Sequence, residues 1–243
     1  MDKKALVSGA SHGLGLSLVK EMMGQGYMVF AGVRGSSDKS GLKGLEPSDR
    51  VHLVDMDVSC SKSVKAALSY VDKVTGSLDV IINNAGILCK ESLNNQDNTI
   101  FDELDVDAMA EAFNVNALGA LRVANTFAGL LAKGKDKLLI NISSEAGGVS
   151  DCTRNKWFGY CMSKAAMNMF GVLAHNELRK HGGRVWQIHP GWMQTYMHGY
   201  LNEAAKYSPD YSAEKICSLI QNAEAYRADN ALFMDMYGKE LNW

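Results

Sequence analysis

The sequence carries no excess of charge of either sign and no long apolar run. Its 243 residues include 25 Lys and Arg against 27 Asp and Glu, a net charge of −2, and the pI is near 6.3. Proteins that bind nucleic acid usually present a strongly basic surface, so we expect no nucleic-acid partner. No segment approaches the apolar length of a membrane span, so we expect no membrane partner.

Cysteine and histidine lack the patterns that indicate disulfides or bound metal. The five cysteines are odd in number and form no Cys-x-x-Cys pair, so we interpret them as reduced thiols. No His and Cys residues have the spacing of a zinc site, and we predict no metal. The chain enters its first expected strand at Ala5, which leaves no room for a signal peptide. These features together predict a cytoplasmic protein.

The sequence does contain a regular alternation of short apolar runs and helical stretches. This alternation predicts a doubly wound parallel sheet of the α/β class, in a single domain that spans residues 1–243. Ligands of such sheets bind beyond the carboxyl ends of the strands. The expected strands are Ala5–Val7, Met28–Ala31, Val51–Asp55, Val80–Asn83, Leu138–Ser143 and Arg184–His189, and the expected helices lie near 14–25, 61–75, 107–133 and 158–180.

A glycine-rich turn links the first strand to the first helix. Glycines occur at positions 9, 13 and 15, in the spacing G-x-x-x-G-x-G rather than G-x-G-x-x-G. A turn without Cβ atoms lets the backbone approach a pyrophosphate, and the N–H groups of the following helix then face the phosphates. The context of strand, turn and helix predicts a dinucleotide site. The alternative is a glycine-rich loop that binds nothing.

Tyr160 and Lys164 are four residues apart in a segment with helical character. On a helix the two side chains lie on one face, one turn apart. A cation beside a phenol favours phenolate, so we expect the pKa of Tyr160 to lie below about 10. Such a phenol exchanges a proton with a carbonyl or alcohol oxygen. Taken alone, the spacing is equally compatible with an ordinary helix pair.

Five motifs, in this order, resemble the short-chain dehydrogenase/reductase family. They are Ser8-Gly9 through Gly13-Leu14-Gly15, Asn83-Asn84-Ala85-Gly86, Ser144, Tyr160 to Lys164, and Pro190-Gly191, and they span nearly the whole chain. More narrowly, His189 to Thr195 and Phe233 to Trp243 resemble C-factor-like and sniffer-like carbonyl reductases. The resemblance implies a Rossmann-type fold, a nicotinamide cofactor, a carbonyl or alcohol substrate, and a homodimer or homotetramer formed through the helices near 107–133 and 158–180.

The resemblance also implies roles for individual residues. Tyr160 would donate the proton, Lys164 would hold the phenolate and the nicotinamide ribose, and Ser144 would polarise the substrate oxygen. The predicted catalytic residues are Asn116, Ser144, Tyr160 and Lys164, with Asn114 and Ser143 as alternatives to Asn116 and Ser144. The predicted cofactor-binding residues are Gly9, Ser11, His12, Gly13, Leu14, Gly15, Arg34, Asp57, Val58, Asn83, Ala85, Gly86, Tyr160, Lys164, Pro190, Gly191 and Thr195.

Two departures from the family pattern bear on these roles. Ser8 stands where the family usually has threonine, which keeps the hydroxyl group. The stretch between Ser144 and Tyr160 is a few residues longer than usual, and the resemblance therefore says little about the substrate.

The end of the second strand should contact the adenosine ribose, about 20 residues after the glycine turn. The segment from Phe30 to Ser37 contains no Asp or Glu that would bind a free 2′-hydroxyl. Arg34 instead offers a guanidinium group that suits a 2′-phosphate. We therefore expect NADP as the cofactor, with NADPH preferred over NADH. A solvated loop arginine is the alternative.

Three segments should flank the nicotinamide: 88–96, 146–158 and a small substrate-loop region near 192–212. Their apolar side chains predict medium-sized apolar or aromatic aldehydes and ketones as substrates. The alternative for several of them, above all Trp192, is packing in the core. The residues are Leu88, Val149, Trp157, Phe158, Trp192, Met193, Tyr196, Met197, Tyr200 and Leu201.

Two other functions remain open on the same fold. A non-catalytic, nucleotide-binding signalling protein would need only the glycine turn, because a fold does not decide a function. A sugar epimerase or dehydratase would normally need a larger C-terminal region than the roughly fifty residues after Pro190.

Overall fold

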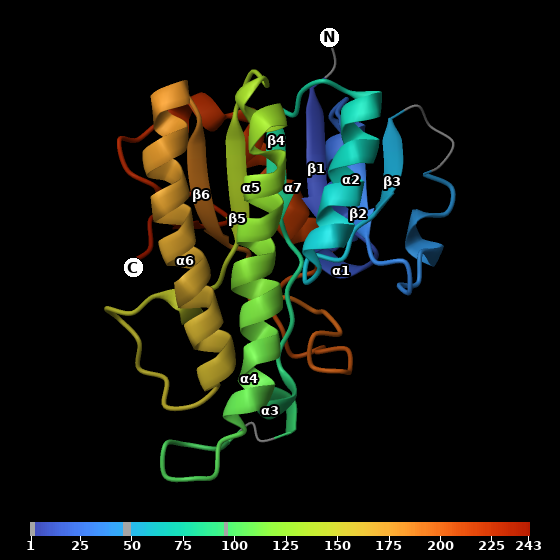
Figure 1. Cartoon of the computed structure of the whole chain (residues 1–243). Helices are drawn as coiled ribbons and strands as arrows, with labels where there is room; N and C mark the ends of the chain where they lie inside the picture. Colours follow the sequence, from blue (N-terminus) through green and yellow to red (C-terminus); the bar gives the residue numbers. More distant parts are fainter. Residues whose placement is uncertain (1–2, 46–49, 95–96) are drawn as a thin grey trace.

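The computed structural model describes residues 3–45, 50–94 and 97–243, and its centre is a parallel sheet (Figure 1). Within these residues seven strands are hydrogen-bonded in the order β3-β2-β1-β4-β5-β6-β7. The strands are β1 Lys4–Ser8, β2 Met28–Val33, β3 Val51–Asp55, β4 Val80–Asn83, β5 Leu138–Ile142, β6 Arg184–His189 and β7 Leu232–Asp235. The order reverses between β1 and β4, and this reversal is where open α/β sheets bind their ligands.

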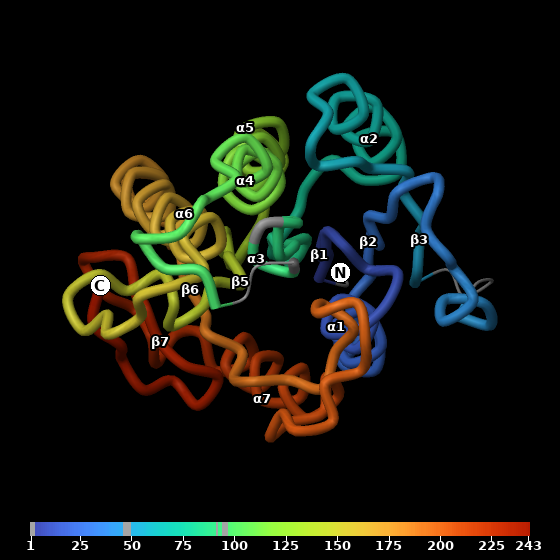
Figure 2. The backbone as a smooth tube through the Cα atoms, turned by 90° about the horizontal axis from the view of Figure 1, so that it is seen from below, coloured from blue at the N-terminus to red at the C-terminus, as the bar shows by residue number. Residues whose placement is uncertain are grey.

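Helices cover both faces of the sheet, which confirms the expected doubly wound architecture (Figure 2). The helices α2, α4, α5 and α6 lie over one face, and α1 and α7 lie over the other. Their bounds are α1 Gly13–Gly24, α2 Ser61–Val74, α3 Lys90–Asn94, α4 Val106–Ala112, α5 Leu118–Ala132, α6 Phe158–Leu178 and α7 Pro209–Gln221.

The core consists of two apolar layers, one on each side of the sheet. Val7, Ile82 and Ile140 belong to the layer under α1 and α7, whereas Leu6 and Ile81 belong to the layer under α2 and α5. Neighbouring residues of one strand therefore point to opposite faces and both are buried. This is why the strands read as continuous apolar runs rather than as alternating patterns.

Three expectations from the sequence need correction. The strand β7 and the helix α7 were not anticipated. The single helix expected over 107–133 is instead two helices joined by a π turn, Phe113–Ala117. The helical stretch Val106–Ala132 is also long and apolar enough to cross a membrane, contrary to the expectation, although half of its most apolar window is buried inside the protein.

Close packing of α6 on the sheet depends on Gly171. A Cβ atom at this position would overlap the amide nitrogen of Gln187 on β6 and lie 2.6 Å from its carbonyl carbon Cδ. Gln187 is fully buried, so its side chain cannot turn aside without displacing its neighbours. The helix can approach β5 and β6 this closely only because residue 171 has no side chain.

We expect Gly171→Ala to destabilise the protein by about 1–3 kcal/mol, because it overpacks the core. Gly129→Ala is the matched control, since Gly129 is exposed on α5 and nothing lies within 4 Å of its added Cβ. There the loss of unfolded-state entropy should stabilise by about 0.5–1 kcal/mol. Thermal unfolding of both variants measures the difference, and equal shifts of the same sign would contradict this account.

Candidate active site

The glycine turn is held against the segment that follows β4. Gly9 and Gly13 have φ angles of +67° and +54°, which favour glycine. The Oγ of Ser8 accepts hydrogen bonds from the backbone N–H groups of Asn84 and Ala85, at 3.0 and 3.1 Å. A Cβ at Gly9 would lie 2.8 Å from the Cα of Ala85. The turn and the Asn84 segment are thus one rigid unit.

The start of α1 fits a phosphate group. Its N-cap residue, His12, makes no side-chain capping bond, and no acidic residue occurs in its first turn. Within the described residues, the first N–H groups therefore lack a side-chain partner and form a positive helix end. A Cβ at Gly13 would meet only the methyl group of Thr195, 3.8 Å away. These features suit a pyrophosphate. The segment that follows β6 passes beside the start of α1 (Figure 2).

Other residues predicted to bind the cofactor lie along the same edge. Pro190 and Gly191 follow β6, and Gly86 lies against both Asn116 and Lys164. The side chain of Leu14 is buried in the core, so only its backbone can face a ligand. His12 is exposed beside the turn, and Ser11 is half-buried.

The side chain of Asn83 is turned into the sheet and away from any ligand. Its Nδ2 donates to the Oδ1 of Asn141 at 2.8 Å and to the carbonyl of Ala120 at 3.1 Å. Asn83 therefore stabilises the sheet with its side chain and can contact a nucleotide only through its backbone.

Arg34, Asp57 and Val58 lie at the adenosine end of the edge. Arg34 is exposed directly after β2, and no carboxylate in the described part of the chain lies within ion-pair distance of it. Hydrogen bonds from Ser59 hold the pKa of Asp57 below its usual value, and the nearby charge of Arg34 adds to the effect. Asp55, the last residue of β3, was not predicted as a site residue. It lies beside Gly35, the residue after Arg34: its Oδ2 would be 3.3 Å from a Cβ added at Gly35.

Asn116 lies in the π turn between α4 and α5 and is fully buried. Its Oδ1 accepts from the N–H of Ile87 at 2.8 Å, and its Nδ2 donates to the Ile87 carbonyl and to the Oγ of Ser163, both at 3.0 Å. The alternative residue, Asn114, instead accepts a bond from Arg122. Single π turns inside helices frequently occur at functional sites.

Ser144 and Tyr160 meet at the carboxyl end of β5. The Ser144 hydroxyl acts to lower the pKa of the Tyr160 phenol. Its Oγ donates to Glu145 Oε2 at 2.7 Å and accepts from the N–H of Ala146 at 3.1 Å. Ser143, the alternative, donates instead to the Oδ1 of Asn168 at 2.6 Å. Ser144 is therefore the serine that faces the phenol.

Lys164 is buried one helical turn after Tyr160. Its Nζ donates to the carbonyl of Ile142 at 2.8 Å and lies 5.8 Å from the centre of the Tyr160 ring. Burial lowers the pKa of Lys164 to about 8. The expected juxtaposition of phenol and ammonium is present, but the ammonium lies over the ring and bonds to a backbone oxygen.

The expected lowering of the Tyr160 pKa is wrong. Burial raises the pKa of Tyr160 to about 12, and the hydrogen bond with Ser144 offsets only part of this effect. The charge of Glu145 raises this pKa further. Burial disfavours the charged phenolate, and this effect outweighs the Ser144 bond that favours it.

A charged group beside Ser144 was not anticipated from the sequence. Glu145 forms an ion pair with Arg154 of the long β5–α6 connection, and its Oε2 lies 3.4 Å from the Nδ1 of His189 at the end of β6. Burial acts to raise the pKa of Glu145, but the Ser144 bond and the charges of His189 and Arg154 outweigh it and hold the pKa below its usual value. Only the position of Glu145 next to Ser144 could have signalled this group.

The expected substrate wall is partly buried and partly exposed. Leu88 is buried, whereas Trp192 is 56% exposed, so the alternative that Trp192 packs in the core is wrong. Trp157 packs edge-on against Tyr160, with ring centres 6.5 Å apart, and also contacts His198. Val149, Tyr196, Met197, Tyr200 and Leu201 are exposed, Phe158 and Met193 are half-buried, and residues 95–96 of the segment 88–96 lie outside the described residues.

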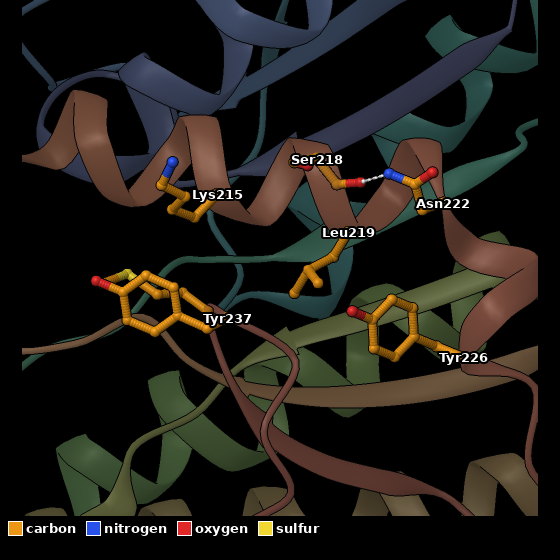
Figure 3. A pocket seen from close by; sticks show the side chains of 7 residues that line it. Lys215, Ser218, Leu219, Asn222, Tyr226 and Tyr237 are labelled. Atoms are coloured by element: carbon orange, nitrogen blue, oxygen red, sulfur yellow. Dashed lines mark hydrogen bonds between the residues drawn. The ribbon is translucent and has the colours of Figure 1, made fainter.

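A separate small cavity of about 190 Å³ lies between α7 and the end of β7 (Figure 3). Lys215, Tyr226 and Tyr237 are among its lining residues, and Asn222 bonds to the Ser218 carbonyl at its edge. None of the predicted site residues lines it, so we do not assign it a part in catalysis.

Comparison with known proteins identifies the class of this fold and site. The model of the short chain dehydrogenase family matches residues 3–206. An uncharacterized oxidoreductase of Schizosaccharomyces pombe is 32% identical over 252 residues, covering 97% of this chain and 96% of the relative. The chain belongs to the short-chain dehydrogenase/reductase family and is an NAD(P)-dependent oxidoreductase.

Solved structures with the same fold include carbonyl reductases. The NADPH-bound carbonyl reductase from chicken fatty liver superposes with a TM-score of 0.85 at 28% identity, covering 100% of this chain and 99% of that one. The carbonyl reductase Sniffer of Drosophila melanogaster gives a TM-score of 0.87 at 22% identity, with full coverage of both chains, and shows the fold. The expected likeness to the carbonyl reductase subgroup is confirmed.

Because the ammonium group of Lys164 is buried, we expect its effect on the stability of the fold to depend on pH. Its pKa of about 8 is depressed from 10.5, so its burial cost is fully present below about pH 8 and disappears as pH rises towards 10.5. Lys164→Met should therefore raise the Tm relative to wild type most at neutral pH, by removing a cost of about 1–3 kcal/mol. The advantage should shrink at alkaline pH.

The pH dependence distinguishes this effect from general changes in packing. Lys65 is exposed on α2, and Lys65→Met should change the Tm by the same small amount at both pH values. If the difference between Lys164→Met and wild type were constant from neutral to alkaline pH, Lys164 would not carry a buried charge.

Proposed function

We propose that the protein is an NADPH-dependent carbonyl reductase that acts on medium-sized apolar or aromatic aldehydes and ketones. The observation that carries the proposal is the contact between Ser144 and Tyr160, next to a buried lysine and at the same sheet edge as the glycine turn. A protein that only binds a nucleotide needs the turn but not this arrangement, which counts against the signalling alternative. The resemblance to an NADPH-bound carbonyl reductase also supports it.

The chain's own residues would divide the work as follows. NADPH, when bound, supplies hydride to the carbonyl carbon. Tyr160 donates its proton to the carbonyl oxygen, and Ser144 donates a hydrogen bond to the same oxygen. The Lys164 ammonium then stabilises the phenolate that remains. Asn116 holds the Ile87 segment and, through Ser163, the first turn of α6 in place.

The substrate class rests on the side chains around Tyr160. Trp157 packs against the phenol ring, Leu88 is buried nearby in the chain after β4, and exposed aromatic and methionine residues follow β6. Each CH₂ group of a ligand that is buried here would strengthen binding by about 0.8 kcal/mol. Glu145 and Arg154 add a charged pair to this otherwise apolar group of side chains.

Exposed apolar side chains on α5 and α6 bear on how the protein assembles. Leu118 and Leu121 on α5 and Met169 on α6 are exposed, whereas Phe127 is buried in the core. We propose that these exposed apolar residues take part in a homodimer or homotetramer contact. We also propose that the protein acts in the cytoplasm on a small-molecule substrate, without nucleic-acid or membrane partners.

The function is tested by NADPH consumption with a series of straight-chain aldehydes and a set of hydroxylated aldehydes. We expect kcat/KM to rise by about fourfold per CH₂ until the pocket is filled. Tyr160→Phe should abolish turnover while it leaves NADPH binding nearly intact, because only the proton donor is removed. Tyr70→Phe, at an exposed tyrosine of α2, should behave as wild type.

Two results would contradict the proposal. A flat response to chain length, or a preference for the hydroxylated aldehydes, would exclude an apolar pocket. If Tyr160→Phe kept more than about a tenth of the wild-type kcat, a barrier change below about 1.4 kcal/mol, another residue would be the acid.

The preference for NADPH can be tested with two variants that should change the affinity for NADPH in opposite directions. Arg34 should attract a 2′-phosphate, whereas the neighbouring Asp55 carboxylate should repel it. Arg34→Ala should weaken NADPH binding by about 1.5–3 kcal/mol and leave NADH little changed. Asp55→Asn should strengthen NADPH binding. Fluorescence titration with both cofactors measures these effects, and equal losses for NADPH and NADH in Arg34→Ala would remove Arg34 from this role.

A further inference from the structure

Arg122 on α5 forms hydrogen bonds to three acceptors from two other parts of the chain. The helices α2 and α5 lie side by side over the same face of the sheet (Figure 2). The Nε of Arg122 donates to the Oγ of Ser61 at the start of α2 at 2.9 Å, and its Nη2 donates to the Oδ1 of Asn114 in the π turn at 3.1 Å. Its Nη1 donates to the carbonyl oxygen of Val58. A guanidinium is planar with its donors in a fixed fork, so these acceptors hold it in one orientation.

The turn between β3 and α2 is fixed from two sides at Val58. The Arg122 guanidinium holds the carbonyl oxygen. The side chain packs against the start of α5, where a Cβ at Gly119 would lie 3.0 Å from the Cγ2 of Val58. The preceding residue, Asp57, is held as well, because its Oδ1 accepts from the N–H and the hydroxyl of Ser59 at 2.9 and 2.6 Å. Contacts within the protein itself therefore set the position of this turn.

The same guanidinium is tied to the catalytic end of the site. Asn114, which accepts from Arg122, belongs to the π turn that also contains Asn116. Asn116 bonds in turn to Ile87 after β4 and to Ser163 on α6. One side chain thus connects the adenosine end of the site to the turn that carries a predicted catalytic residue.

We propose that Arg122 is a positioning residue for the cofactor: its guanidinium fixes the Asp57–Val58 turn against α5 and the π turn, so that the surface for the adenosine half is preformed. A preformed surface binds more tightly because less ordering is required on binding. Arg122 acts through Val58 and does not touch the reacting atoms. The inference rests on the expected contact of Asp57 and Val58 with adenosine, and it depends neither on the preference for NADPH nor on the substrate.

The position of the turn gives Arg122 a different effect from Arg34. Arg34 should act on the 2′-phosphate, which NADPH carries and NADH lacks. The Val58 turn should act on the adenosine that both cofactors share. Loss of Arg122 should therefore weaken NADH and NADPH by the same factor. Reduced nicotinamide mononucleotide lacks adenosine and should not respond.

The test measures the dissociation constants of NADH, NADPH and reduced nicotinamide mononucleotide by fluorescence titration of the full chain. In Arg122→Met both dinucleotides should bind about tenfold more weakly, because the Val58 turn loses an orienting hydrogen bond. The mononucleotide should bind as it does to wild type. Arg122→Lys keeps the charge but replaces the planar fork by one compact ammonium, so it should weaken both dinucleotides almost as much.

Three further variants separate the position of the turn from charge and from folding. Lys62→Met removes an exposed positive charge at the start of α2 and should leave all three affinities nearly unchanged. Gly119→Ala keeps the guanidinium but presses on the Val58 side chain, so it should weaken the two dinucleotides alone. The effect of Asn114→Ala should not add to that of Arg122→Met, because both remove the same oriented guanidinium. Thermal unfolding checks each fold, and Gly119→Ala carries the test if Arg122→Met does not fold.

Three results would overturn the inference. Unchanged dinucleotide affinities in Arg122→Met would remove Arg122 from this role. An equal loss for the mononucleotide would indicate a general disturbance of the site, and wild-type affinities in Arg122→Lys would leave only an effect of charge. If wild type binds NADH as tightly as NADPH, the proposed preference for NADPH fails, while an equal effect of Arg122→Met on both cofactors still supports the role of Arg122. The titrations use no substrate, so they are independent of whether aldehydes are reduced.

Discussion

The geometry of the site depends on one buried charge, the ammonium group of Lys164. A buried ammonium is stabilised only by the oxygen atoms placed around it. Here the carbonyl at the end of β5 takes this role, and it fixes the first turns of α6 against the sheet. Gly86, in the segment after β4, lies beside the same nitrogen. The strand, the helix and the nucleotide segment therefore meet at a single atom.

A second set of polar contacts keeps the reacting groups in register. Asn168 on α6 accepts from Ser143 and donates to the carbonyl of Gly147, so the turn after β5 is tied to the helix on both sides of Ser144. Asn116 does the same for the segment after β4. These buried amides satisfy their partners almost completely, which gives the site rigidity without relying on the mobile ends of long side chains.

Sequence patterns predicted those strands and helices whose formation depends on neighbouring residues in the chain. Six of the seven strands in the described residues were expected, because buried parallel strands read as apolar runs. The strand β7 is only four residues long and lies at the edge, so its pattern is weak. The π turn could not be expected, because Asn114 and Asn116 interrupt an otherwise regular helical pattern without any local signal.

Tertiary effects account for what sequence reasoning missed at the site itself. The Tyr-x-x-x-Lys spacing describes one pair of groups, whereas burial and a carboxylate contributed after β5 raise the pKa of Tyr160. Trp157, held at a φ of +63° that a bulky side chain rarely adopts, packs against the same phenol. Burial of a lysine and a strained backbone both reduce stability, and both lie next to Tyr160. Their convergence on one hydroxyl is what separates this site from the rest of the fold, where local pattern and global packing agree.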